Sequence, residues 1–156
     1  MNPKELTIIE KLADVEHVET PYFIYSPNMD ELNDKDLYFE EFFKWAYFTR
    51  NITLLVDEAM EVSENPFSIP RHYKGILTRG RTRDVSVWSC TQRPAGLSPM
   101  IISQSKHIFM FNLRKKEDRK KIADSTGVPE FMDNPSGHYF WYWKDGMTEA
   151  AKGILK

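Results

Sequence analysis

Two acids end a mostly apolar run near the middle of the chain. Residues 51–59, NITLLVDEA, lead through Val56 into Asp57 and Glu58. Such a run is typical of a parallel strand buried on both faces, and ligands of open α/β sheets bind at the carboxyl ends of the strands. The first carboxylate could hold Mg²⁺ through its water shell, and the second could polarise an attacking water. The alternative is a pair of acids that only caps a turn or faces solvent.

A second polar group follows the next predicted strand. Residues 84–92, DVSVWSCTQ, end in Thr91 and Gln92, with Arg93 directly after them. The amide of Gln92 both donates and accepts hydrogen bonds, which suits a group that reads the state of a ligand. One predicted helix separates this strand from the strand before the acids, so the spacing suits neighbouring strands. The alternative for Gln92 is a side chain that only satisfies a turn.

Three arginines precede this second strand. Arg79, Arg81 and Arg83 fall within five residues, at the end of a helix predicted for residues 71–80. Arginine forms bidentate hydrogen bonds with carboxylates and phosphates, and crowding three of them is costly unless an anion or an acidic partner lies near. For any one of them, a solvated basic turn is the other interpretation.

Taken together, these motifs resemble one group of ATPases. Residues 80–94, GRTRDVSVWSCTQRP, resemble the FtsK pattern of Gly-Arg, a strand and then Thr-Gln-Arg-Pro. The resemblance continues through ISQSKHIFMFNL, a helix with Glu-Asp-Arg at 117–119, Gly127 and a final strand led by glycine. It extends from Ile52 to Trp143 and indicates the FtsK/HerA kind of P-loop DNA translocase.

The resemblance implies a role for each of these residues. Asp57 and Glu58 would be the Walker B pair, with Mg²⁺ near Asp57 through water and the attacking water activated by Glu58. Gln92 would sense the γ-phosphate. Arg81 would act on the neighbouring subunit of a ring, with Arg83 the second choice. Further contacts with ATP are expected from Asp57, Arg79, Thr91 and Arg93.

The sequence departs from this family in one respect. A phosphate-binding loop, G-x-x-x-x-G-K-[ST], needs glycines for close backbone approach and a lysine for the β- and γ-phosphates, and no segment has this pattern. The first strand of the fold is normally interior, so a gap in the sheet is expected. The chain is a piece of a longer protein, or takes this unit from elsewhere, or is a relative that does not hydrolyse ATP. By itself it is not expected to hydrolyse ATP efficiently.

Composition excludes several other classes of protein. The chain has 156 residues, 41% hydrophobic and 28% charged, which fits one globular domain spanning residues 1–156. A net charge of −2 argues against coating nucleic acid by bulk electrostatics, although a ring needs only a few basic groups at its pore. The single cysteine excludes an internal disulfide, and no apolar run approaches the ~20 residues of a membrane span. These features predict a cytoplasmic protein.

Helices and strands alternate in the rest of the pattern. This alternation predicts an α/β fold, and with the motifs a RecA/ASCE-like P-loop NTPase: a largely parallel sheet flanked by helices, without its first strand. Strands are predicted at 20–28, 51–59, 84–92, 106–113 and 138–143, and helices at 3–16, 37–48, 71–80 and 115–127.

The first hypothesis is a subunit of an ATP-driven motor that translocates or packages double-stranded DNA. It would be encoded by a phage and work as a ring of five or six copies. An assembly ATPase of filamentous-phage type is an alternative within the same superfamily. The alternative from another class is a non-catalytic interaction or scaffold domain that kept the sheet and lost the nucleotide.

Overall fold

Strands and helices alternate along the chain. The structure, a computed structural model, describes residues 6–63 and 67–155. The first elements are β1 (Leu6–Ile9), the 3₁₀ helix η2 (Leu12–His17), β2 (Tyr22–Tyr25), α1 (Met29–Leu32), α2 (Lys35–Thr49), β3 (Ile52–Val56), α3 (Ala59–Val62), α4 (Arg71–Arg79) and the 3₁₀ helix η3 (Gly80–Arg83). The later elements are β4 (Val85–Ser89), η4 (Pro94–Gly96), α5 (Pro99–Ser103), β5 (His107–Met110), α6 (Lys116–Thr126), η5 (Pro129–Met132), β6 (Tyr139–Lys144) and β7 (Ala151–Ile154).

Within the described residues the strands form three small sheets. β1 pairs with β2 and β3 pairs with β4, both in parallel. β5, β6 and β7 form an antiparallel sheet in that order. The predicted α/β class is therefore confirmed. The ladders, however, do not join into one continuous parallel sheet.

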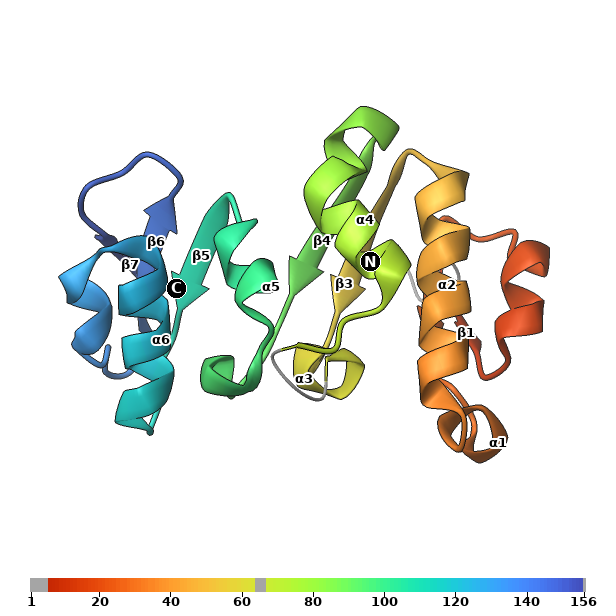
Figure 1. The fold of residues 1–156 in the computed structure, drawn as a ribbon, viewed down its shortest axis with the longest axis horizontal. Helices are drawn as coiled ribbons and strands as arrows, with labels where there is room; N and C mark the ends of the chain where they lie inside the picture. Colours follow the sequence, from red (N-terminus) through yellow and green to blue (C-terminus); the bar gives the residue numbers. More distant parts are fainter. Residues whose placement is uncertain (1–5, 64–66, 156) are drawn as a thin grey trace.

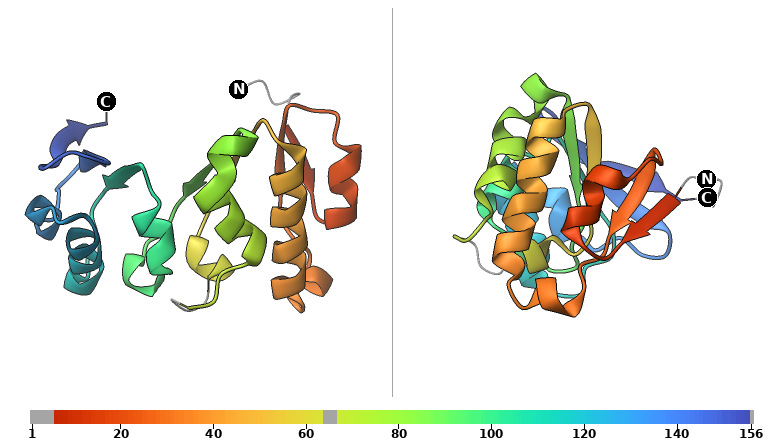
Figure 2. Two further views of the ribbon diagram at one scale, coloured as in Figure 1. Left: turned by 45° about the horizontal axis from the view of Figure 1, so that its top comes forward. Right: turned by 90° about the vertical axis from the view of Figure 1, so that its right-hand side faces the viewer.

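The longer helices lie on one side of the strands. Figures 1 and 2 show α2, α4, α5 and α6 in a single layer, with β3, β4 and β5 behind it. Exposure alternates along β3: Leu54 and Val56 are buried, whereas the Leu55 side chain between them is 71% exposed. Trp88 of β4 and Phe109 of β5 are exposed in the same way. We call the apolar side formed by Leu55, Trp88 and Phe109 the open face. None of the described helices is long and apolar enough to cross a membrane.

A gap separates β4 from β5. Among the described strands, β4 has a ladder only with β3, and β5 only with β6. Figure 1 shows β4 and β5 running in the same direction on either side of the gap. The rings of Trp88 and Phe109 stack across it, with centroids 5.9 Å apart. Because no described strand pairs with either edge facing the gap, the gap could accept one further strand.

The buried apolar residues form two hydrophobic cores. The central core joins α2, β3, α4, β4 and α5, and the C-terminal core joins β5, α6, η5 and β6. In the central core the Tyr73 ring stacks on Phe43 at 4.5 Å, and the Tyr73 hydroxyl lies 2.6 Å from Ser89 Oγ. The buried residues of the C-terminal core are Met110, Ile122, Ala123, Val128, Phe131 and Trp143.

One predicted helix is wrong. Of the helix expected at 3–16, residues 3–5 lie outside the described residues, and Leu6–Ile9 forms β1 instead. The β-branched residues in this segment favour an extended backbone, and β1 gains a parallel partner in β2. Of the predicted helix, only the part from Leu12 onward is helical, as the short 3₁₀ helix η2. The other predicted strands and helices are present with shifted ends, and β7 was not predicted.

Candidate functional site

The acid pair forms a tight turn at the carboxyl end of β3. Asp57 is exposed, and its Oδ1 accepts a hydrogen bond from the Glu58 N–H at 3.0 Å. Glu58 has φ 46° and ψ 60°, in the left-handed region, directly before α3. For a residue other than glycine this conformation costs of order 1–3 kcal/mol and persists only where the surroundings impose it. The strain therefore marks Glu58 as a residue whose position is fixed.

Parallel pairing beyond the strand ends imposes this position. The Cys90 N–H donates to the Val56 carbonyl at 2.9 Å, and the Ala59 N–H donates to the Cys90 carbonyl at 2.7 Å. These bonds place the residue after Cys90 beside the acid turn. The Thr91 hydroxyl donates to Glu58 Oε1 at 3.5 Å, the outer limit of a hydrogen bond. The structure thus brings Thr91 and Glu58 together, as the two strand ends predict.

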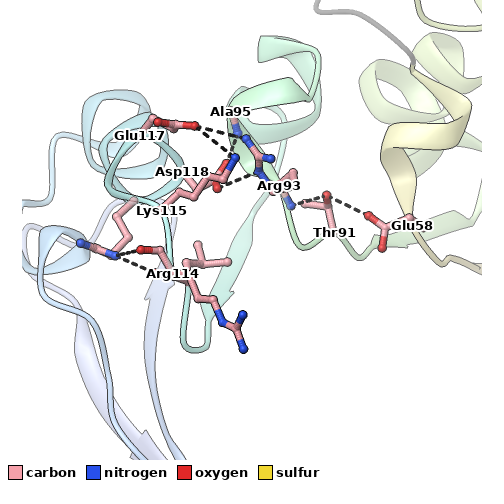
Figure 3. Close-up of polar contacts among 10 residues, drawn as sticks. Glu58, Thr91, Arg93, Ala95, Arg114, Lys115, Glu117 and Asp118 are labelled. Atoms are coloured by element: carbon pink, nitrogen blue, oxygen red, sulfur yellow. Dashed lines mark hydrogen bonds and ion pairs between the residues drawn. The ribbon is translucent and has the colours of Figure 1, made fainter.

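The turn after β4 is held by α6 (Figure 3). Arg93 Nε donates to Asp118 Oδ2 at 3.0 Å, and the Ala95 N–H donates to Asp118 Oδ1 at 2.9 Å. Arg93 Nη2 also donates to Glu117 Oε1 at 3.2 Å. Figure 3 shows the Arg93 guanidinium directed toward α6 and away from Glu58.

The side chains of Arg93 and Gln92 have different surroundings. Arg93, expected to contact ATP, has its guanidinium engaged by Asp118 and Glu117, so its role as a ligand contact stays a prediction. Gln92 is exposed on the same turn, directly after Thr91. Its role as a sensor also stays a prediction.

Asp118 is the residue that sequence reasoning missed. It lies within the Glu-Asp-Arg segment that the resemblance includes, but the resemblance implies no role for it. The available signal was an acid in the first turn of a predicted helix, at a spacing that also fits a solvated face. Only the fold shows that this acid is buried, at 1% exposure, against the turn after β4.

The three arginines lie at the other end of β3 and β4. The Arg83 carbonyl accepts from the Asn51 N–H at 3.3 Å, just before β3 begins. Its guanidinium lies 4.3 Å from the ring centroid of Tyr47 on α2. Arg79 and Arg81 are exposed near the same end. The three arginines and the acid turn therefore lie at opposite ends of the β3–β4 pair.

Gly80 is required by close backbone packing. A Cβ atom at this position would lie 2.4 Å from the Val85 carbonyl oxygen, which is too close for any side chain. The chain leaves α4 and enters β4 through this contact. The glycine of the Gly-Arg pair therefore sets the path into β4, and Arg81, which follows it, is exposed.

The acid turn is a region of negative charge. Cys90 is an exposed residue, but neighbouring atoms cover part of its thiol. This desolvation raises the pKa of the thiol, and the charges of Asp57 and Glu58 raise it further. Among residues 6–63 and 67–155, no three acids, histidines or cysteines are grouped so as to hold a metal. The exposed Asp57 carboxylate offers the kind of oxygen ligand that a hydrated Mg²⁺ takes from one or two carboxylates.

Comparison with known proteins shows which solved structures have a similar fold. No protein-family model matches the sequence, and no curated protein sequence matches it. The genome packaging NTPase B204 from Sulfolobus turreted icosahedral virus 2 in complex with AMPPCP matches with a TM-score of 0.69 and 19% identity, over 99% of this chain and 76% of that chain. The sulfate complex matches with a TM-score of 0.70 and 16% identity, over 97% and 82%.

A related virus protein gives the same result. B204, the DNA-packaging ATPase from Sulfolobus Turreted Icosahedral Virus, matches with a TM-score of 0.63 and 21% identity, over 94% of this chain and 72% of that chain. At these identities the likeness establishes the fold. The chain thus has the fold of viral genome-packaging NTPases, and the resemblance found in the sequence is confirmed at that level.

Proposed function

We propose that the chain is the Walker B and sensor half of a Mg-ATP-driven motor subunit of FtsK/HerA type, which packages or translocates double-stranded DNA. The observation that carries the proposal is the meeting of Glu58 and Thr91 at the carboxyl ends of two paired parallel strands. The names of the structural neighbours support it, because they are genome-packaging NTPases in complex with AMPPCP and ATP-γS.

The residues of the turn suit distinct tasks in phosphoryl transfer. Asp57 would hold Mg²⁺ through water, and the ion would offset charge on the phosphates. Glu58 would orient the attacking water and accept its proton, while the Thr91 hydroxyl steadies the carboxylate. Gln92 would read the γ-phosphate from the same turn. Arg81, or Arg83, would reach the site of the next subunit in a ring of five or six copies.

The gap between β4 and β5 supports a division of the ATPase into two parts. A strand entering the gap in parallel with β4 would end at the same edge as Thr91, because parallel strands share their carboxyl edge. A phosphate-binding loop after that strand would then lie next to the acid turn. A helix following the loop could cover the open face, since parallel sheets are normally covered on both sides.

The solved neighbours fit this division. They match nearly all of this chain but 72–82% of their own length, so part of each neighbour has no counterpart here. We infer that the phosphate-binding unit comes from outside residues 1–156, in the same polypeptide or another. We call the complex that contains it the complete ATPase.

The test is Glu58→Gln in the complete ATPase. ATP binding is expected to persist, because glutamine keeps the shape of the side chain, while turnover falls by about 10²–10⁴-fold through loss of the base. Glu61→Gln is the matched control, since Glu61 is exposed on α3 and loses the same charge. Unchanged hydrolysis in Glu58→Gln would contradict the assignment. Absence of hydrolysis in the parent protein would favour the scaffold alternative.

A further inference from the structure

One buried carboxylate connects the turn after β4 to α6. Asp118 is 1% exposed and uses both oxygens on this turn, one for Arg93 Nε and one for the Ala95 N–H. A buried carboxylate is tolerated only when its charge is paired and its oxygens are hydrogen-bonded, and breaking such a pair is strongly destabilising. The turn and the first part of α6 therefore move together.

The connection extends to the acid turn through Thr91. Its Oγ1 accepts the Arg93 N–H at 3.0 Å, so its single proton is left to point at Glu58 Oε1, 3.5 Å away. The backbone position of Arg93 thus sets the place and direction of the Thr91 hydroxyl. Because 3.5 Å is the outer limit of a hydrogen bond, a small movement of the turn makes or breaks the contact with Glu58.

On the other side, α6 belongs to the C-terminal core. Ile122 and Ala123 of α6 are buried together with Trp143 of β6 in that core. A displacement of α6 therefore carries the antiparallel sheet with it, because a packed core does not deform freely. The path from Glu58 to the C-terminal sheet is continuous through Thr91, Arg93 and Asp118.

We propose that Arg93 and Asp118 are positioning residues that set the Thr91–Glu58 contact and transmit a change at Glu58 to α6 and the C-terminal sheet. The proposal rests on the proposed function in that Glu58 is taken as the hydrolytic group. It gives Arg93 a different task from the ATP contact that the sequence resemblance implies. The two tasks predict different kinetics.

The first experiment needs no nucleotide. Asp118→Asn keeps the size of the side chain but removes its charge, so the bond from Arg93 weakens. Amide hydrogen exchange in residues 91–97 and 116–120 is expected to become roughly tenfold faster, the loss for a hydrogen bond to a charged group. Asp124→Asn is the control, because Asp124 is exposed on the same helix and exchange should stay within twofold of the parent.

The second experiment uses the complete ATPase. Asp118→Asn is expected to lower kcat about tenfold with little change in KM for ATP, because it displaces Thr91 without touching the nucleotide. Arg93→Lys retains a cation for Asp118 and should restore part of kcat relative to Arg93→Ala. If Arg93 instead contacts phosphate, both Arg93 variants raise KM, and that result overturns the proposal.

The outcomes separate the two claims. Faster exchange together with lower kcat in Asp118→Asn supports the proposal. Exchange equal to that of Asp124→Asn overturns it, and so does faster exchange with unchanged kcat while Glu58→Gln still abolishes turnover. If Glu58→Gln leaves turnover intact, the proposed function fails, and the exchange result by itself then decides whether Asp118 fixes the turn to α6.

Discussion

The central core and the C-terminal core use their strands in opposite ways. In the central core, β3 and β4 are parallel, so their carboxyl ends meet and place Glu58 beside Thr91. In the C-terminal core, β5, β6 and β7 are antiparallel, so their carboxyl ends alternate between the two edges. Parallel pairing therefore gathers the polar residues that follow the strands at one edge of the sheet. Antiparallel pairing does not, and the side chains of neighbouring strands meet instead on the face of the sheet.

That face carries aromatic rings. The Phe109 centroid lies 4.8 Å from that of Tyr142 and 5.9 Å from that of Phe140, on the side of the sheet away from α6. Among the described residues, α5 and η4 of the central region lie against α6 of the C-terminal region. Trp88 stacks on Phe109 across the gap, and Arg93 pairs with the buried Asp118. The region that bears the site is thus joined to the second region by an aromatic stack, by polar contacts and by helix packing.

The largest expected effect comes from opening the C-terminal core. Phe131 is fully buried at 0% exposure, and Phe131→Ala should destabilise this region by about 3–5 kcal/mol through the cavity it leaves. Because the buried residues of the two cores form separate clusters, the C-terminal region should then unfold at lower urea than the central core. Urea titration with hydrogen exchange as a regional probe measures both transitions.

The matched variant is Phe43→Ala in the central core. Phe43 is 2% exposed and stacks on Tyr73, so the cavity cost is similar. Here the regions around β3 and β4 should lose protection first. If both variants shift one common transition by the same amount, the two cores are a single cooperative unit and the comparison is wrong.

A smaller effect is expected at Cys90, beside the acid turn. Desolvation raises the thiol pKa first and the charge of Asp57 raises it further, so Asp57→Asn should lower that pKa in part and make alkylation at pH 8 faster. The pH–rate profile of iodoacetamide modification measures the shift. Asp84→Asn is the control, because Asp84 lies before β4, at the far end of the strand. A midpoint that moves equally in both variants would exclude a local charge effect.

The same raised pKa has a consequence for stability. The unfolded thiol has a pKa of about 8.5, and the folded thiol has a higher one. The folded protein therefore binds the proton more tightly, and this contribution to stability is present below pH 8.5 and is lost as pH rises through the folded pKa. Asp57→Asn should reduce that loss.

The elements around the site could be predicted because local signals agree there. Apolar runs predict β3 and β4, and the helix before β4 stops at Gly80, which the structure explains by the approach of the Val85 carbonyl. The meeting of strand ends then follows from parallel order. β7 could not be predicted in this way, because Lys152 and Gly153 give its short sequence no strand pattern.

The finer features depend on contacts distant in sequence. Glu58 adopts a left-handed conformation because β4 imposes it, and nothing in the letters Asp-Glu indicates a positive φ. Arg93 and Asp118 are 25 residues apart and pair only because α6 packs beside the turn. Arg83 lies over Tyr47 because η3 packs beside α2. Side-chain partners of long, charged residues are set by the fold.

The most direct test of the central claim locates the metal. In the complete ATPase with bound ATP, Fe²⁺ replaces Mg²⁺, and ascorbate with peroxide then generates radicals that cut the nearby backbone. The account predicts ATP-dependent cuts at Asp57 and Glu58 and beside Thr91, and their loss in Asp57→Ala. Cuts confined to the arginine end of β4 or to the sheet of β5, β6 and β7 would contradict it.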